Sequence, residues 1–343
     1  MSQQMLQAIR QEADFLGFNR CNVASVEPYV GIEHYDSYLA KGHHAGMSWM
    51  VRSRPPRARP DLLLPGAKSI VTLGVDYRWP RPERPNKSVG RVSAYAWGRD
   101  YHKLIGKRLK KLGFRLKDLF PELNLYWGVD SRPFIERAWA ERSGLGFVGK
   151  NTMLISPGQT SFFFLAMLML DVDLPSTEPL KRNFCGKCRK CLDFCPTDAF
   201  VGPFQLDARK CISYLTIEHK GSIPTHLRSL MGDWIFGCDL CQEVCPHNHK
   251  TPEGKLRDLA PREGHAWIDL AWILSASDDE ILKKYEGTPL RRAGPIRLKR
   301  NAAVVAGNIN AQHLHKHLRD LCDGSVELLR EHARWALDLM SKN

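Results

Sequence analysis

The chain has 343 residues, with 50 Lys and Arg against 37 Asp and Glu, so its net charge is +13. A chain of this length forms two or three domains with sizeable cores. Its longest apolar run, residues 162–170, is about half as long as a membrane span and is followed by aspartates, which excludes a membrane-spanning helix there. The first 20 residues lack the apolar stretch of an export signal, so we expect a cytoplasmic protein without membrane association.

The positive charge is concentrated in two segments. Residues 78–117 hold thirteen Lys and Arg against two acidic residues, and residues 283–300 hold seven against one. Solvated helix faces would account for one such cluster. Two separate clusters favour a polyanionic partner, such as a nucleic acid.

In chain order, residues 1–175 are predicted to form an α/β domain. Leu6, Ile9 and Ala13 mark the buried face of a first helix. A second helix is expected over 101–120, with one apolar stripe and most of the first basic cluster on its other face. A Ser, an early Pro and a terminal Gly predict a third over 131–144. The predicted strands are residues 68–77, 124–130, 151–156 and 161–170.

Beyond this segment the composition changes twice. A proline-containing joint at 174–184 leads into a region that holds eight of the ten cysteines. From 255 onward the pattern is helical, and Ser277 with Glu280 forms a capping box. We therefore expect an α/β or α+β protein with three domains: an α/β domain at 1–175, a ferredoxin-like module at 176–254, and a helical, HEAT-like module at 255–343.

Eight cysteines have the spacing of ligands for two iron–sulfur clusters. Residues 185–196 read C-x2-C-x2-C-x3-C-P, and residues 238–246 repeat the end of that pattern. In two-cluster ferredoxins the Cys before the Pro binds the other cluster. The spacing therefore assigns Cys185, Cys188, Cys191 and Cys245 to one [4Fe–4S] cluster, and Cys195, Cys211, Cys238 and Cys241 to the other.

Zinc is the alternative metal that these thiols could bind. A tetrahedral zinc site is usually built from two close pairs of ligands. Three thiols at i, i+3 and i+6, followed by Cys-Pro, favour three corners of a cubane cluster instead. Two such clusters form a one-electron relay, and the large domain beside them indicates that the electrons are used on a substrate.

Residues 144–151, GLGFVGKN, match G-x-G-x-x-G and nearly match a phosphate-binding loop. Both motifs require a preceding strand and a following helix. Here a predicted helix precedes and a predicted strand follows, so the sequence argues against nucleotide binding. A glycine-rich turn that lets a large cofactor approach the backbone stays open.

Several ordered motifs resemble the epoxyqueuosine reductase family, the cobalamin-dependent iron–sulfur enzymes of tRNA modification. The resemblance covers nearly the whole chain and is carried by the double Cys block together with RARPDLLLPGAKSIV (57–71), SAYAWGRDYHK (93–103), VDSRPFIERAWAERSGLGFVGKNTMLI (129–155) and GTPLRRAGPIRLKRNAAVVAGN (287–308). It implies that cobalamin lies between the N-terminal domain and the ferredoxin-like module. It also implies that the reduced cobalamin removes the epoxide oxygen of epoxyqueuosine at the wobble position of tRNA, giving queuosine in the queuosine biosynthesis pathway.

The resemblance also implies roles for individual residues. Asp130 matches the family's proton donor, although without the resemblance it would be interpreted as a helix cap. Arg57 and Asp239 match positions that contact cobalamin, as do Ser213 and Ser93, and Ser93 stands where some relatives carry Cys. Arg57 also has a plain interpretation, as one solvated charge among several neighbouring arginines.

The same resemblance implies which residues bind tRNA. A basic segment of the C-terminal module would grip the phosphates of the anticodon arm through Arg291, Arg292, Arg297, Lys299 and Arg300. The wobble base would be splayed out and stacked on an aromatic side chain, with Tyr95, Trp97 and Tyr101 as candidates. The expected substrates are tRNAs with GUN anticodons, and the expected partners are this tRNA and a separate electron donor. No sequence feature indicates an oligomer, so we expect a monomer.

Two other functions fit parts of the sequence. A reductive dehalogenase-like enzyme would use the same cobalamin and two clusters on a small molecule, but the basic C-terminal segment has no role there. A non-catalytic two-cluster electron carrier would dock on an acidic partner and would need neither Asp130 nor a corrin. The tRNA reductase is the hypothesis that uses all of these features.

Overall fold

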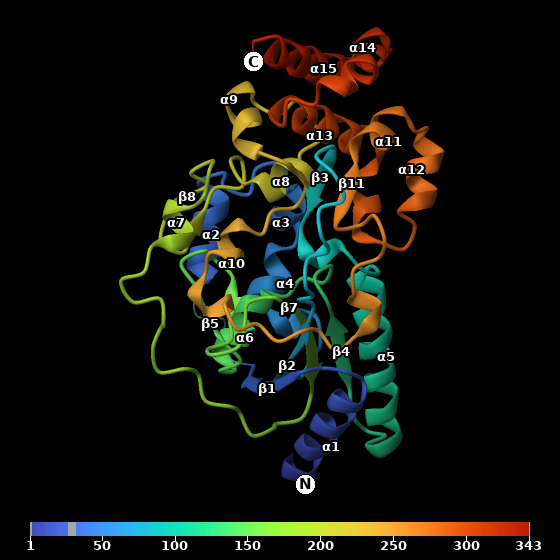
Figure 1. Cartoon of the computed structure of the whole chain (residues 1–343). Coiled ribbons are helices and arrows are strands. Elements are labelled where there is room, and N and C mark those ends of the chain that lie inside the picture. The colour runs from blue at the N-terminus through green and yellow to red at the C-terminus, as the bar shows by residue number, and fades with distance from the viewer. Residues whose placement is uncertain (1, 27–31, 343) are drawn as a thin grey trace.

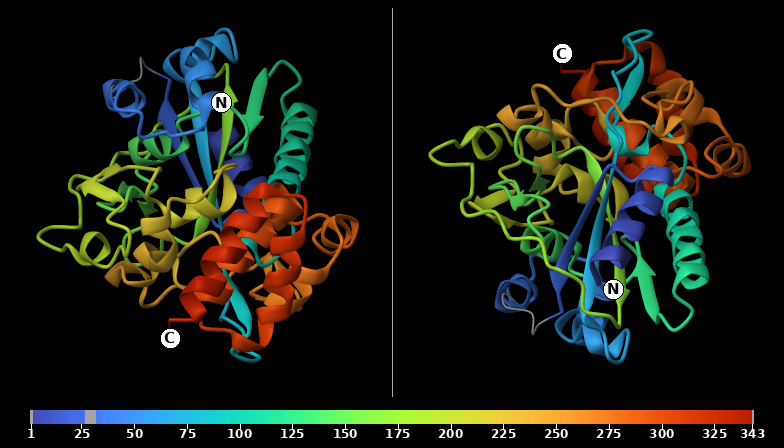
Figure 2. Two further views of the ribbon diagram at one scale, coloured as in Figure 1. Left: turned by 90° about the horizontal axis from the view of Figure 1, so that it is seen from above. Right: turned by 90° about the horizontal axis from the view of Figure 1, so that it is seen from below.

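The protein is described by a computed structural model over residues 2–26 and 32–342, which Figures 1 and 2 show in three views. A four-stranded sheet forms the centre of the N-terminal half, in the order β1 (Arg20–Ser25), β2 (Ser69–Asp76), β7 (Phe163–Leu170) and β4 (Leu125–Gly128). Every neighbouring pair is antiparallel. The N-terminal half is therefore α+β, because its strands are not linked by the parallel crossovers of an α/β fold.

Helices cover both faces of this sheet. Alternate residues of the buried strands β2 and β7 point to opposite faces. Val71 and Leu168 pack in the same cluster as α1 (Ser2–Phe15) and α5 (Tyr101–Leu119), whereas Ile70 and Met169 pack with α6 (Glu136–Arg142). A sheet covered on both faces has continuous apolar strands, which explains the apolar run at 162–170.

Helix α5 follows its predicted pattern. Ile105, Leu109, Leu112 and Leu116 are fully buried along one face, and Asp100 caps the helix by accepting from the backbone N–H of His102. The helix predicted over 131–144 is shorter, because α6 begins only at Glu136. The strand predicted over 151–156 is reduced to β6 (Leu154–Ile155), which pairs with β5 (Phe147–Val148).

A second sheet joins the three predicted domains. Strand β3 (Val89–Val92) lies between β10 (Trp234–Phe236), which is parallel to it, and β11 (Trp267–Asp269), which is antiparallel. One cluster of buried apolar residues runs through the N-terminal segment and on into 255–343. The segments 1–175, 176–254 and 255–343 thus share a sheet and a core.

The remaining helices and strands fall in three segments of the chain. In the first segment they are α2 (Ile32–Ala40), α3 (Ser48–Arg52) and α4 (Arg54–Ala58), and in the cysteine-rich segment they are α7 (Lys190–Asp193), β8 (Phe200–Gly202), β9 (Gln205–Leu206), α8 (Ile212–Ile217), α9 (Thr225–Arg228) and α10 (Leu240–Glu243). The C-terminal part holds α11 (Leu270–Ser275), α12 (Asp278–Lys284), α13 (Gly294–Asn308), α14 (His315–Asp323) and α15 (Glu327–Met340). The predicted capping box starts α12. In the described part of the chain, no helix combines the length and apolarity needed to cross a bilayer.

Of the arginines predicted to grip tRNA, one lies inside the fold and another is half-buried. Arg300, in α13, is fully buried and donates to the backbone carbonyls of Leu215 (2.6 Å), His219 (2.8 Å) and Gly221 (2.7 Å). Burial lowers the pKa of its guanidinium to about 9. Arg297 likewise donates to the carbonyl of Ile217 at 2.7 Å. The phosphate-binding role expected for Arg300 is therefore wrong: its donors fasten α13 to the segment around α8.

This anchor has a measurable consequence for stability. Arg300→Ala leaves buried carbonyls without a donor, and we expect it to lower the free energy of unfolding by roughly 2–4 kcal/mol. Denaturant unfolding followed by circular dichroism measures the change. Arg292→Ala is the matched control, because this side chain is exposed, and it should unfold like the wild type. Equal unfolding curves for Arg300→Ala and the wild type would contradict the anchoring role.

Candidate cluster sites and active site

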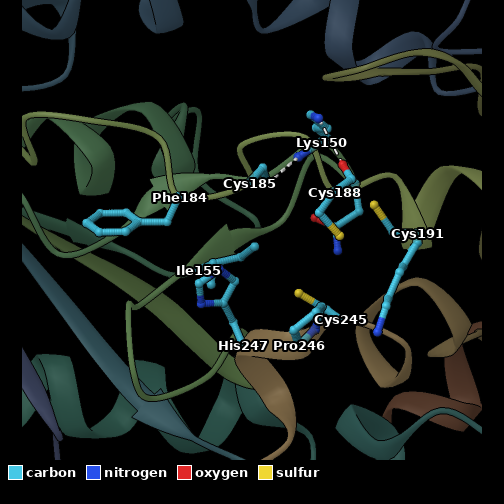
Figure 3. A pocket seen from close by; sticks show the side chains of 11 residues that line it. Lys150, Ile155, Phe184, Cys185, Cys188, Cys191, Cys245, Pro246 and His247 are labelled. Carbon is cyan, nitrogen blue, oxygen red and sulfur yellow. Dashed lines mark hydrogen bonds between the residues drawn. The ribbon is translucent and has the colours of Figure 1, made fainter.

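The first four predicted ligands surround one cavity. Cys185, Cys188, Cys191 and Cys245 line a space of about 120 Å³, with the thiols of Cys188, Cys191 and Cys245 facing one another in Figure 3. The first three come from the segment around α7, and Cys245 comes from the segment that follows α10. The structure thus brings the Cys-Pro cysteine of the second motif to the first, as ligand exchange between two motifs requires.

The other four predicted ligands form a second group. Burial raises the pKa of the Cys238 thiol, and the nearby thiols of Cys211 and Cys195 raise it further. Burial and then Cys238 and Cys211 do the same for Cys241, which also lies close enough to Cys191 of the first group to feel its charge. Thiols that must ionise to bind metal are thus gathered where bound iron would offset their mutual repulsion.

The glycine-rich turn at 144–151 holds both groups. The backbone N–H of Lys150 donates to Cys185 Sγ at 3.4 Å, and its Nζ donates to the carbonyls of Gly186 (2.7 Å) and Cys188 (2.8 Å). Asn151 Nδ2 donates to the carbonyl of Cys241 at 3.0 Å. The turn leads into the β5–β6 hairpin, so it is no phosphate-binding loop. Sequence reasoning missed Lys150 and Asn151, although the unexplained glycine motif marked their place.

Asp130 forms the centre of a hydrogen-bonded network. It follows β4 with a φ of +53°, and its backbone N–H donates to Glu136 Oε1 at 2.7 Å. The Tyr101 hydroxyl donates to Asp130 Oδ2 at 2.6 Å, and His102 Nε2 lies 2.6 Å from the same atom. His102 Nδ1 lies 2.7 Å from Asp100 Oδ1, which orients the ring. Asp130 is therefore not a helix cap.

The network places its proton on the imidazole. Burial alone would raise the pKa of Asp130, but the hydrogen bonds from His102 and Tyr101 outweigh it and lower that pKa below its usual value. Burial would lower the pKa of His102, but the bonds to Asp100 and Asp130 raise it. Both ring nitrogens of His102 face carboxylate oxygens, and these pKa directions favour a carboxylate on Asp130 opposite an imidazolium.

A carboxyl group with a raised pKa lies beside this pair. Burial, followed by the charge of Asp130, raises the pKa of Glu136 to about 8. Its neutral form avoids a second negative charge next to Asp130, as expected for two carboxyl groups that share one site. Asp130 itself keeps half of its side-chain surface (50%) exposed, so it is the member of the network that a substrate can reach.

Aromatic side chains line the network. Tyr101 stacks on Phe164 with ring centroids 4.1 Å apart, and Tyr95 meets Tyr101 edge to face at 6.0 Å. Trp97 is buried and donates its indole N–H to the carbonyl of Val92, so it cannot stack on a base. Tyr95 and Tyr101 remain as the aromatic candidates.

Four further predicted cofactor contacts are placed differently from one another. Ser93 and Asp239 are buried against each other, with the Ser93 hydroxyl donating to Asp239, which also accepts from the N–H of Ala94 at 2.7 Å. Arg57 is buried and donates to Ser53 and to the carbonyl of Phe134, just before Glu136. Ser213 is half-buried in α8.

Three of these groups, Ser93, Asp239 and Arg57, lie near the Asp130 network, and we call this series of neighbours the arc. Burial raises the pKa of Tyr95, and the negative charges of Asp130 and Asp239 raise it further. The ring therefore lies close to both carboxylates. Arg57 lies near enough to Glu136 for its charge to act on that carboxyl group. The arc therefore runs from Arg57 through Asp130 and Tyr95 to Asp239.

Two of the predicted tRNA contacts are exposed. Arg291 forms an exposed ion pair with Glu286 at 3.7 Å, and the charge of Arg292 reaches Asp100, His102 and Asp130. Lys299 is mostly covered and pairs with Asp278 at 3.1 Å.

A second cavity adjoins the Asp130 turn on the same side as Arg292. It measures about 340 Å³ and is lined by the exposed cations Lys103, Lys107 and Arg132 and by Trp127. Sequence reasoning noted the basic helix face but did not connect these cations with Asp130.

Comparison with known proteins identifies the family. A model described as "4Fe-4S double cluster binding domain" matches residues 184–248, and one described as "Epoxyqueuosine reductase QueG, DUF1730" matches residues 57–131. The epoxyqueuosine reductase of Pseudomonas aeruginosa is 42% identical over 97% of this chain and 94% of its own, and that of Escherichia coli is 39% identical over 97% and 89%. The chain belongs to the epoxyqueuosine reductase family.

Solved members of the family have the same fold. An epoxyqueuosine reductase bound to an epoxyqueuosine-modified tRNA-Tyr stem loop superposes with a TM-score of 0.92, at 28% identity, over 99% of this chain and 91% of its own. A Bacillus subtilis member with the same scores has the loop of its catalytic aspartate swung out of the active site. All eight cysteines of the two groups lie within the matched 4Fe–4S double cluster binding domain, so the family supports iron–sulfur clusters over zinc.

Ligand exchange between the motifs predicts an asymmetric loss of iron. Cys245→Ser removes a ligand of the group around Cys185, although Cys245 follows the second motif. We expect iron to fall from about eight to about four per chain, with the remaining cluster held by Cys195, Cys211, Cys238 and Cys241. Cys322→Ser is the control and should keep all the iron. Double mutants with Cys185→Ser test the pairing: if Cys245 served the other cluster, the double mutant would lose both.

Proposed function

We propose that this protein reduces epoxyqueuosine to queuosine at the wobble position of tRNA, in the anticodon arm. The observation that carries the proposal is the half-exposed Asp130, held by Tyr101 and His102 on one side of a molecule that also gathers two groups of four cysteines. Family membership supports it, because a solved relative binds an epoxyqueuosine-modified stem loop. The protein is expected to act as a cytoplasmic monomer.

The reaction defines what the site must supply. Removing the oxygen of an epoxide to leave a carbon–carbon double bond consumes two electrons and two protons and releases water. Each cluster carries one electron at a time. The two cysteine groups come close to each other at Cys191 and Cys241. This proximity suits the delivery of two electrons to one place.

The arc from Arg57 to Asp239 suits cobalamin, as the family resemblance implies. The amide groups on the rim of a corrin need both donors and acceptors, and the arc offers hydroxyl, carboxylate and guanidinium groups. Ser93, Ser213, Asp239 and Arg57 would hold the rim, and Asp130 would face the substrate. When bound, cobalamin would supply the two-electron chemistry at the epoxide, while the protein supplies placement and protons.

In this proposal the chain's own residues supply the first of the two protons, and solvent supplies the second. The oxygen released from an opened epoxide carries negative charge and needs a proton at once. We propose that Asp130 and His102 act as one acid. The proton rests on His102 Nε2 and moves to Asp130 when the substrate oxygen approaches the carboxyl group, while Asp100 stabilises the charged ring. Glu136, which accepts from the Asp130 N–H, holds the turn in place.

Cations around this network would hold the RNA. Arg291 and Arg292 keep exposed guanidinium groups, and Lys103 and Lys107 line the cavity beside Asp130. Phosphate contacts fix the register of an RNA without selecting its bases, so these residues would position the anticodon arm over Asp130. The predicted preference for GUN anticodons is a finer proposal and rests on the family resemblance alone.

Turnover of Asp130→Asn tests the proposed function. Reconstituted protein is incubated with epoxyqueuosine-containing tRNA and a chemical reductant, and the tRNA nucleosides are quantified by mass spectrometry. The wild type should convert the epoxide to queuosine. Asp130→Asn should lower the rate by about 10²–10⁴-fold while iron and cobalamin contents stay unchanged. Asp118→Asn, an exposed position on α5, is the control. No queuosine from the wild type would refute the function, and an unchanged rate for Asp130→Asn would refute its role.

The pH dependence tests whether His102 stores the proton. Since the folded-state pKa of His102 is raised, its charged form persists above the ordinary imidazole value and is lost as pH rises through the raised pKa. Wild-type turnover should therefore fall on the alkaline side. His102→Gln should turn over slowly and should show no alkaline decrease in rate. Asp100→Asn should shift the alkaline decrease to lower pH, because it removes a partner that raises the pKa of His102. If His102 had only a structural role, His102→Gln would lower the rate by the same factor at every pH.

A further inference from the structure

The segment around the first cysteine group has an unusual surface. Of the thirteen large apolar side chains that are exposed in the described part of the chain, four lie between residues 184 and 204. They are Phe184 (37% exposed), Phe194 (54%), Val201 (49%) and Phe204 (48%), and we call them the cluster-side patch. Clustered exposed apolar groups on a soluble protein mark an interaction surface.

Hydrogen bonds tie this patch to both cysteine groups. Phe184 lines the cavity of the first group, and the N–H of Phe204 donates to the carbonyl of Lys150, whose own N–H reaches Cys185. Phe194 precedes Cys195, and Cys195 Sγ accepts from the N–H of Ala199 just before β8, the strand of Val201. Cys188 is exposed, so the first group lies at the surface.

Positive charge accompanies the patch. Residues 181–204, which contain the patch, hold two carboxylates, Asp193 and Asp198, and Asp193 pairs with Arg189 at 3.1 Å. The same residues hold five cations, which are Lys181, Arg182, Lys187, Arg189 and Lys190. Over the described residues, no carboxylate forms an ion pair with Lys181 or Lys187, and both are exposed. A partner that docks here must therefore carry negative charge.

The segment of the patch lies apart from the elements expected to bind RNA. In Figures 1 and 2, α7 and β8 lie at one edge of the molecule, and α5 lies at the opposite edge. The Asp130 network and its cations belong to the α5 side. The cations of 181–194 are thus separate from those expected to bind tRNA.

We propose that the cluster-side patch and its cations form the docking surface of an acidic one-electron carrier protein. The carrier is oxidised by one electron at each encounter, and the cluster held by Cys185, Cys188, Cys191 and Cys245 is reduced by one, so two encounters supply the pair consumed per epoxide. The inference rests on the proposed function only for the fate of these electrons. A small patch with charge around it suits a transient redox encounter, since such interfaces are among the smallest.

Binding and cluster reduction by a carrier test the proposal. Reduced flavodoxin, an acidic flavoprotein, is the probe, and the reconstituted holoprotein is the acceptor. Calorimetry at low salt measures affinity, and stopped-flow bleaching of the iron–sulfur absorbance measures the rate of electron transfer. Lys181→Glu/Lys187→Glu should lower both by about tenfold or more, and the loss should shrink as salt is raised. Lys316→Glu/Lys342→Glu, exposed positions in the C-terminal part, changes the net charge equally and should behave like the wild type.

Two further measurements separate the proposal from its rivals. Phe204→Ser should weaken flavodoxin binding at every salt concentration, because it removes apolar contact and no charge. All variants should be reduced by dithionite at the wild-type rate and should keep their affinity for tRNA. The proposal is overturned if the patch and control variants bind flavodoxin equally, or if the patch variants lose tRNA affinity instead. Failure of the wild type to reduce epoxyqueuosine with dithionite would refute the proposed function and leave the binding result intact.

Discussion

The pairing of β3 with β10 is the constraint on which the site depends. Strand β10 leads directly into Cys238, Asp239 and Cys241, and β3 leads directly into Ser93. The bond from Ser93 to Asp239 and the parallel ladder therefore fix the cysteine-rich segment against the strand-to-helix region that ends in α5. In the proposed reaction the electrons go to the carbons of the epoxide and the protons go to its oxygen. Both must therefore reach the same small group, so the residues that deliver them cannot belong to domains that move independently.

The Asp130 network answers a conflict between two needs of that site. A proton donor beside a reducing centre must hold its proton at neutral pH, yet it must stay exposed enough to meet a substrate. Burial would satisfy the first need and defeat the second. Sharing the proton with His102, whose ring is covered and held by Asp100, lets Asp130 stay half exposed while the proton rests behind it. The raised pKa of Glu136 limits further negative charge at the turn.

Sequence patterns predicted what depends on neighbours along the chain. The stripe of α5 and the capping box at Ser277 follow from short spacings, and the structure contains both. It also brings four of the eight predicted cysteine ligands around one cavity. Contacts between distant segments were not accessible in this way. The charge of Arg300 is visible in the sequence, but the carbonyls that enclose it come from α8 and the loop after it. The late start of α6 depends on the left-handed backbone at Asp130, which no local pattern required.

The net charge of +13 therefore has several separate uses rather than one. Arg300 and Arg297 donate hydrogen bonds to backbone carbonyls and stabilise the contact between α13 and the segment around α8. Lys103, Lys107 and Arg292 lie near a carboxylate that would otherwise repel a polyanion, which suits the proposed approach of RNA to Asp130. The cations near Cys188 lie at the other edge, where the first cysteine group reaches solvent. Separating the last two groups lets an anionic substrate and an anionic electron carrier occupy the molecule together, since each is attracted to its own edge and neither must leave before the other binds.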